Sequence, residues 1–115
     1  MNPDDLKKEL ENLTKNSSLF EIQQYINHMV KVRHFDNDNP TNLMLFLTEE
    51  LGELAKEVRK REKLKVDVDK ETKVDVEGEI VDVFIYLLSL CRVLDIDLLE
   101  AFQKKERINS NRTWE

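Results

Sequence analysis

Turn-forming residues are scarce in this chain. Its 115 residues include only two glycines and two prolines, which leaves few positions for tight turns and favours long helices over many short strands. Hydrophobic residues make up 40% of the chain and charged residues 37%, so one core is possible and the composition argues against disorder. The sequence therefore predicts an all-helical fold and a single domain over residues 1–115.

Start signals and the helical spacing of apolar residues predict five helices. The first follows the start signal Asn2-Pro3 and ends at about Thr14. The charged stretch 61–72 is predicted to be a loop; it hints at a calcium loop, but the positions that need glycine and glutamate hold Thr72 and Gly78. The other four helices are predicted over about residues 18–33, 41–60, 73–94 and 97–109; Ser18 and Glu21 form a capping-box pattern at the start of the second, and Asp97 caps the fifth.

The charge balance bears on the partners. Lys and Arg number 18 and Asp and Glu number 24, which gives a formal net charge of −6. An acidic surface attracts neither nucleic acid nor anionic lipid, so neither partner is expected. The chain opens with polar residues rather than a signal peptide, and its longest apolar run, 83–88, is too short to span a bilayer. A cytoplasmic protein is expected, with the single cysteine, Cys91, as a buried thiol.

Acidic side chains recur on the third predicted helix. Leu43, Leu47, Leu51, Leu54 and Val58 follow the spacing of one core stripe. Glu49, Glu50 and Glu53 lie together on a neighbouring face, because successive residues turn by ~100° around a helix. Such carboxylates repel one another, although a glutamate-rich face is often only a solvated surface.

The fourth predicted helix carries two acids in an apolar setting. From residue 76 to 94 its apolar side chains point in nearly every direction, as expected for a helix at the centre of a bundle. Glu79 and Asp82 lie one turn apart within it, and no lysine or arginine occurs between Lys73 and Arg92. Burying unpaired carboxylates is costly, so these acids require a cation nearby.

Two helices therefore each offer a pair of acids three residues apart. All-carboxylate coordination suits Mg²⁺ or Mn²⁺. A di-iron bundle would require a histidine three residues after a glutamate, and neither His28 nor His34 has this relation. Zinc is disfavoured for the same reason, and neither histidine is assigned a role. From the residues alone, a Mg²⁺ site and a solvated acidic surface both remain open.

These residues resemble a known family. The stretch 48–55, followed by 79–83, is similar to the E-E-x-x-E and E-x-x-D motifs of MazG-like and dCTP-pyrophosphatase-like nucleotide pyrophosphohydrolases. The likeness extends over about residues 20–114. It implies a four-helix core, here with a short additional N-terminal helix, and assembly as a homodimer or homotetramer.

The resemblance also implies an activity and a set of site residues. The activity is the Mg²⁺-dependent hydrolysis of a nucleoside triphosphate to a monophosphate and pyrophosphate, a house-cleaning reaction on non-standard or excess nucleotides. Glu49 and Glu50 are the catalytic candidates, and Glu49 would orient or deprotonate the attacking water. The implied metal ligands are Glu50, Glu53, Glu79 and Asp82.

Further residues are implied to hold the substrate. Lys105 and Arg112 would bind phosphates, and Asn109 would contact sugar or phosphate. Phe35 and Tyr86 would stack on the base, although either residue can equally be part of the core. Lys60 stands where dCTP-directed members carry a tryptophan, so a preference for dCTP is not implied. Trp114 can cover the site of a neighbouring subunit or lie free in solvent.

Two other functions fit the same pattern. One is a related phosphoanhydride hydrolase, such as a phosphoribosyl-ATP pyrophosphohydrolase. The other is a non-catalytic helical bundle that binds a nucleotide or a partner helix. Release of pyrophosphate from a panel of nucleoside triphosphates would separate the first function from both alternatives.

Overall fold

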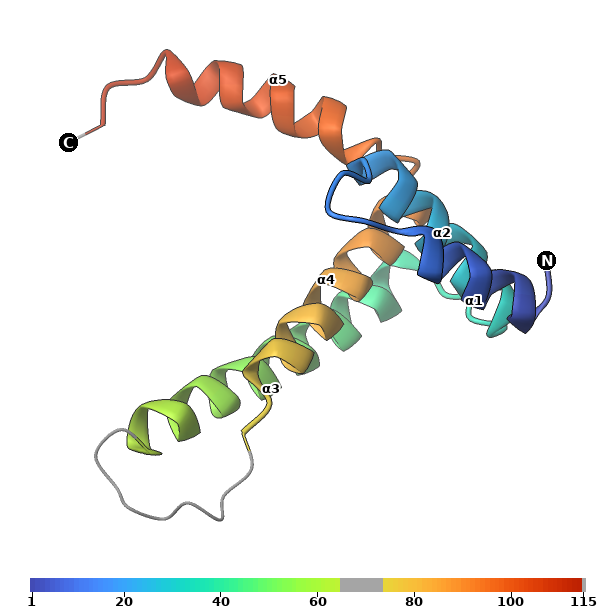
Figure 1. Cartoon of the computed structure of the whole chain (residues 1–115). Coiled ribbons are helices and arrows are strands. Elements are labelled where there is room, and N and C mark those ends of the chain that lie inside the picture. Colours follow the sequence, from blue (N-terminus) through green and yellow to red (C-terminus); the bar gives the residue numbers. More distant parts are fainter. Residues whose placement is uncertain (65–73, 115) are drawn as a thin grey trace. The chain divides into compact units, whose positions relative to one another are not determined.

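The computed structural model describes residues 1–64 and 74–114, and these residues form five helices and no strand (Figure 1). The all-helical prediction is therefore confirmed. The helices belong to two compact units, one of Met1–Asn37 with Cys91–Glu115 and one of Asp38–Leu90. Helix α4, Val76–Val93, gives most of its length to the second unit and its last turn to the first.

The first unit begins with two capped helices, α1 (Pro3–Asn12) and α2 (Leu19–Val32). Asn2 and Asp5 form a capping box at the start of α1, and Ser18 and Glu21 form another at the start of α2. Each box pairs backbone N–H groups that a helix start otherwise leaves without acceptors. Both start signals seen in the sequence are confirmed.

Helix α1 packs against α2. Leu6 is buried between them with Ile26 and Met29, and the Nδ1 atom of His28 lies 2.7 Å from a carboxylate oxygen of Glu9. The histidine that the sequence left without a role thus pairs with an acid of α1. This contact supplements the apolar packing that holds the short N-terminal helix in place.

One buried glutamine ties α2 to the start of α5 (Leu98–Ser110). Gln23 is 8% exposed; its Nε2 donates to the carbonyl oxygen of Ile96 at 3.1 Å, and its Oε1 accepts from the N–H of Leu98 at 3.0 Å. Ile96 lies in the connection between α4 and α5, and Leu98 is the first residue of α5, whose N-cap is Asp97 as predicted. Gln23 therefore fixes where α5 begins.

Two helices end without the glycine that usually follows a helix. His34 (φ 60°) follows α2 and Asp95 (φ 54°) follows α4. The next N–H reaches back five residues in each case, from Phe35 to the carbonyl of Val30 and from Ile96 to that of Cys91. These bonds are the mark of a left-handed helix stop. With two glycines in the chain, other residues take this conformation at a cost of about 1–2 kcal/mol each.

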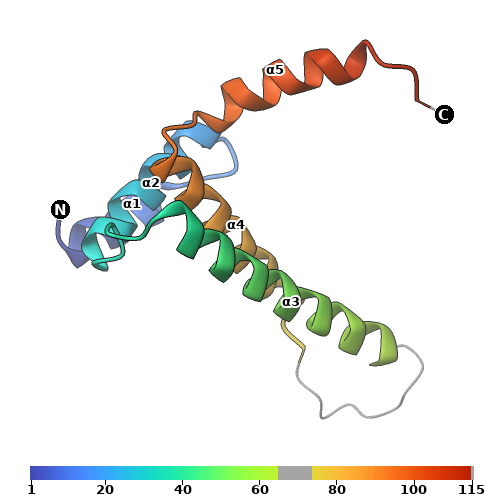
Figure 2. The same ribbon diagram turned by 180° about the vertical axis from the view of Figure 1, so that it is seen from behind.

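The second unit consists of α3 (Pro40–Leu64) and most of α4, which run antiparallel side by side (Figures 1 and 2). Asn39 caps α3 by accepting from the N–H of Asn42 at 2.9 Å. Asp75 caps α4 by accepting from the N–H of Gly78 at 2.9 Å. A Cβ atom on residue 78 would collide with the Asp75 carboxylate, so glycine leaves room for this cap.

A short chain of contacts fixes the end of α3 against the start of α4. Glu57 accepts from the N–H of Asp75 at 3.1 Å through one oxygen and pairs with the ammonium group of Lys60 at 3.0 Å through the other. The hydrogen bond from Lys60 is the largest cause that lowers the pKa of Glu57, followed by that from Asp75. An ionised Glu57 therefore sets the register of the two helices.

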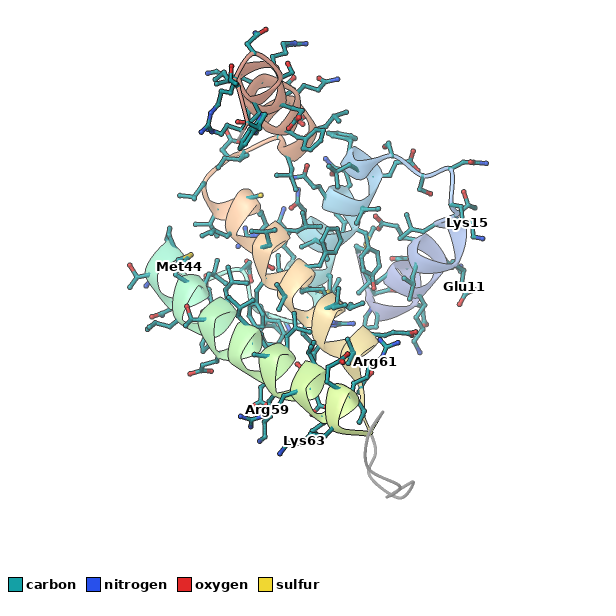
Figure 3. All side chains as sticks on the ribbon, turned by 90° about the vertical axis from the view of Figure 1, so that its left-hand side faces the viewer. Glu11, Lys15, Met44, Arg59, Arg61 and Lys63 are labelled. Carbon is teal, nitrogen blue, oxygen red and sulfur yellow. The ribbon has the colours of Figure 1, made fainter. Side chains whose placement is uncertain are left out.

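The structure corrects two details of the third predicted helix. Helix α3 continues to Leu64, so residues 61–64 are helical rather than part of a loop. The rest of the predicted loop, residues 65–72, lies outside the described residues. Figure 3 shows Arg59, Arg61 and Lys63 on these last turns, where cations suit the negative end of the helix dipole. The predicted core stripe is only partly buried, because Leu51 and Val58 are exposed.

None of the helices in residues 1–64 and 74–114 is long and apolar enough to cross a membrane.

We expect the substitution Gln23→Leu to destabilise the protein by roughly 1–3 kcal/mol, because it leaves a part-buried carbonyl and a part-buried N–H without their partner at nearly constant side-chain volume. Gln24→Leu, one residue along α2 and half-buried, is the control and should change stability by less than about 1 kcal/mol. Urea unfolding measures both. Equal effects of the two variants would show that the Gln23 hydrogen bonds do not hold α5.

Candidate metal centre

Three carboxylates meet where α3 and α4 lie side by side. Glu50 comes from α3, and Glu79 and Asp82 come from consecutive turns of α4; one oxygen of each lies within 4.8 Å of the others. Glu50 and Glu79 are half-buried, whereas Asp82 is exposed. The two acid pairs recognised in the sequence thus approach one another within one unit, and three of the four predicted metal ligands form the cluster.

The cluster makes the ionised form of Glu79 unfavourable. Burial is the largest cause that raises the pKa of Glu79, followed by its contact with Glu50 and by the charge of Asp82. One oxygen of Glu79, Oε2, is inaccessible to solvent and has no hydrogen-bond partner. A buried, partnerless carboxylate oxygen that faces other carboxylates is costly unless a positive charge is present.

A small divalent cation fits this arrangement. Among residues 38–64 and 74–90, no lysine or arginine forms an ion pair with the three acids. The ion pair in this part of the chain joins Lys60 to Glu57 instead. Three hard oxygen donors within a few ångströms suit Mg²⁺ or Mn²⁺ and lack the nitrogen or sulfur ligands typical of zinc. The orphaned oxygen of Glu79 is the atom whose burial such an ion would compensate.

Glu53 and Glu49 lie at the solvent-exposed edge of the cluster. Glu53 is exposed and lies outside the group of three, but its charge contributes to the raised pKa of Glu79. Glu49 is also exposed, and its charge acts on Tyr86. The cluster itself thus consists of the half-buried Glu50 and Glu79 with Asp82, and Glu49 and Glu53 are its exposed neighbours.

Two aromatic rings lie beside the acids. The rings of Tyr86 and Phe46 have centroids 5.8 Å apart and are tilted by 39°. Burial raises the pKa of the Tyr86 hydroxyl, and the charges of Glu50 and Asp82 raise it further, so Tyr86 is a neutral hydrogen-bond donor at physiological pH. The predicted base-stacking residue therefore lies in the electric field of the cluster.

The remaining predicted site residues belong to the first unit. Phe35 follows the end of α2 and is 55% exposed. Lys105 is an exposed residue of α5, and Asn109, half-buried near its end, has an Oδ1 atom that is buried and unpaired. Arg112 lies beyond the end of α5, with its guanidinium 4.4 Å from the ring centroid of Trp114. Trp114 contacts its own helix end rather than lying free in solvent.

Two residues of this region were not assigned to the site from the sequence. Phe46 lies one turn before Glu50 and supplies the ring against Tyr86. Glu57 lies two turns after Glu50 and joins α3 to α4. Both stand at the four- and seven-residue spacing that puts side chains on the face of Glu50. That spacing was the available signal, and it could not reveal which partner helix the face would meet.

The fold and the cluster together define a class: an all-helical protein with a carboxylate cluster between two helices whose donor set fits a small divalent cation. Comparison with known families agrees, because the model of the MazG nucleotide pyrophosphohydrolase domain matches residues 38–112. The chain belongs to this family, as the sequence motifs predicted. The matched region contains the whole acidic cluster, Tyr86 and α5.

A relative in Bacillus subtilis (strain 168) shares the sequence and the fold. YpjD, a protein of uncharacterised function, is 40% identical over 84 residues, which are 73% of this chain and 72% of YpjD. The crystal structure of YpjD, described as a candidate pyrophosphatase, superimposes with a TM-score of 0.70 at 31% identity, covering 87% of this chain and all of the other. The chain is therefore similar to an all-helical protein of this kind over most of its length.

We expect Glu79→Gln to stabilise the metal-free protein at neutral pH. The pKa of Glu79 is raised above its ordinary value of 4.5, so ionisation is harder in the folded state, and wild type loses stability as the pH rises from about 4.5. The variant lacks this loss. Thermal melts in chelator should therefore coincide near pH 4 and separate in favour of the variant towards pH 8.

The control for this experiment is Glu77→Gln, which removes an exposed carboxylate from the first turn of the same helix. Adding Mg²⁺ should raise the melting temperature of wild type more than that of Glu79→Gln, because binding to the folded state stabilises it. A Glu79→Gln protein that is less stable than wild type at pH 8 in chelator would show that this carboxylate holds the helices together.

Proposed function

We propose that the protein hydrolyses nucleoside triphosphates, ribo- or deoxyribonucleotides, to a monophosphate and pyrophosphate with the help of Mg²⁺. The observation that carries the proposal is the cluster of Glu50, Glu79 and Asp82 around a buried, unpaired oxygen. Membership in the MazG family supports hydrolysis of a phosphoanhydride. A house-cleaning role on non-standard or excess nucleotides is part of the proposal.

The acids would have different roles in such a reaction. Glu50, Glu79 and Asp82, with Glu53 at the exposed edge, would hold Mg²⁺, which supplies charge neutralisation for the phosphate oxygens when bound. Glu49, next to Glu50 and exposed, would orient the attacking water and take its proton. The water oxygen forms a bond to phosphorus, the anhydride bond breaks, and pyrophosphate leaves. No covalent nucleophile is required, because positioning and charge neutralisation supply most of the rate.

Substrate recognition would use both the aromatic rings and the cations. Tyr86, supported by Phe46, offers a ring beside the acids, and Phe35 offers an exposed ring in the first unit. Lys105, Asn109 and Arg112 would bind phosphate or sugar groups, as the family resemblance implies. Lys60 is engaged with Glu57, which is consistent with a base preference other than that of dCTP-directed relatives.

We expect Glu50→Gln and Glu53→Gln each to abolish pyrophosphate release, because each removes a charged metal ligand at constant volume. Loss of several kcal/mol of transition-state stabilisation corresponds to a fall of roughly 10²- to 10⁴-fold in kcat/KM. A panel of nucleoside triphosphates with Mg²⁺, read by pyrophosphate release, measures this. Glu77→Gln is the control and should remain active.

Outcomes of the same assay separate the competing functions. Near-normal turnover in Glu50→Gln would contradict the proposed site. Mg²⁺-dependent nucleotide binding without pyrophosphate release from wild type would indicate a binding protein, and activity only on another phosphoanhydride would indicate the related hydrolase.

A homodimer or homotetramer built on a four-helix core completes the proposal. Helix α4 does not lie at the centre of a bundle within one chain, since Ile80, Phe84 and Leu87 are 51%, 36% and 39% exposed. At ~100° per residue these side chains share one face of α4, roughly opposite the face of Glu79 and Asp82. An apolar face of this kind marks an interface. A second copy can therefore cover it without displacing the acids.

We expect light scattering at micromolar concentration to give at least twice the chain mass of 13.7 kDa. Phe84→Glu should shift the protein towards monomer while circular dichroism stays helical, because a carboxylate is costly in an apolar interface. Ala55→Glu places the same charge at an exposed position of α3 and should leave the mass unchanged. A wild-type mass near that of one chain would refute the assembly.

A further inference from the structure

The end of the chain presents an aromatic ring that is held in place although it is exposed. Trp114, the only tryptophan, is 65% exposed. Its Nε1–H donates to the carbonyl oxygen of Asn109 at 3.1 Å, and the guanidinium of Arg112 lies 4.4 Å from its ring centroid. A ring fixed by a hydrogen bond and a cation–π contact, with most of its surface in water, is a preorganised surface for another flat group.

The segment that carries this ring is positively charged within an acidic protein. Residues 104–114 contain Lys104, Lys105, Arg107 and Arg112 against one carboxylate, Glu106, whereas the whole chain has a net charge of −6. The four cationic residues are exposed. Cations in the last turns of α5 are stabilised by the negative end of the helix dipole, but Arg112 lies beyond the helix, which ends at Ser110. The helix dipole therefore does not explain all of the positive charge in residues 104–114.

Ring and charge together select a class of ligand. A free anion would use the cations and leave the ring exposed, and an apolar group would use the ring and leave the cations without acceptors. A nucleotide uses both, because its base stacks on an aromatic face and its phosphate accepts hydrogen bonds from lysine and arginine. An arginine that lies against an aromatic ring still directs its N–H groups outwards in the plane of the guanidinium group. Arg112 can therefore contact the Trp114 ring and a phosphate at the same time.

We propose that Trp114 and Arg112 form a metal-independent nucleotide-binding platform, with the base stacked on the ring face that Arg112 leaves open and the phosphate held by the cations at the end of α5. The inference rests on the proposed function, which already gives Arg112 a phosphate contact, and adds Trp114 as the surface that takes the base without a metal ion. Asn109 positions the platform, since its backbone carbonyl anchors the indole N–H. Trp114 thereby gains a binding role that the acidic cluster does not supply.

The single tryptophan makes the test direct, because all tryptophan emission comes from the platform. Full-length protein in chelator is titrated with AMP and, separately, with ribose 5-phosphate. AMP should quench the emission saturably, with a dissociation constant on the order of 0.1–1 mM for one stacked base with exposed phosphate contacts. Ribose 5-phosphate, which has the phosphate but no base, should leave the emission unchanged.

Variants identify the residues. Arg112→Gln should weaken AMP binding roughly fivefold through loss of the stacked, phosphate-facing cation, and Arg59→Gln, an exposed arginine on the last turns of α3 (Figure 3), should not. Trp114→Ala should abolish AMP binding measured by calorimetry, and Trp114→Phe should retain part of it. Circular dichroism checks that each variant folds.

The outcomes separate this proposal from the hydrolase function. Absence of quenching by AMP, equal quenching by ribose 5-phosphate, or unchanged affinity for AMP in Arg112→Gln would overturn the platform. This holds whether or not the protein releases pyrophosphate in the presence of Mg²⁺. Conversely, base-dependent quenching in chelator supports the platform even if no triphosphate in the panel is hydrolysed. Retention of AMP binding in Glu50→Gln would further support a site that does not need the acidic cluster.

Discussion

The repulsion among carboxylates between α3 and α4 is the constraint on which the site depends. Helix packing brings Glu50 and Glu79 together and buries one oxygen of Glu79 without a partner. Apolar packing of the helix pair must offset this repulsion in the absence of a cation. In the proposed function the same acids hold the cation, so the local cost in stability and the proposed catalysis have the same physical origin.

In the first unit, polar contacts position the helices although few turn-forming residues are present. Capping boxes start α1 and α2, and His34 and Asp95 end α2 and α4 in a conformation that glycine would adopt more easily. Gln23 then fixes the connection into α5 through two part-buried hydrogen bonds. Polar contacts of this kind fix the directions of the helices, which a small apolar core does not determine by itself.

Local signals in the sequence predicted most of the fold, because caps and helical spacing act within a few residues. Ser18 and Asp97 cap helices as predicted. The end of α3 was misplaced because residues 61–64 are charged but remain good helix formers, and charge alone does not end a helix. The acids were found through their spacing, whereas the contact of Phe46 with Tyr86 depends on how two helices pack, which neither sequence segment encodes by itself. Exposure of Leu51 was missed for the same reason.

The contact between Glu57 and Asp75 has a consequence for protein engineering. It anchors the two helices on either side of the segment that joins them, so the alignment of Glu50 with Glu79 is set by residues outside that segment. Extra residues between Leu64 and Val74 lengthen a connection whose two ends this contact already holds, at an entropic cost of only about 0.6 kcal/mol for each doubling of its length. Peptide tags or reporter domains can therefore be inserted at this point with little expected effect on the acidic cluster.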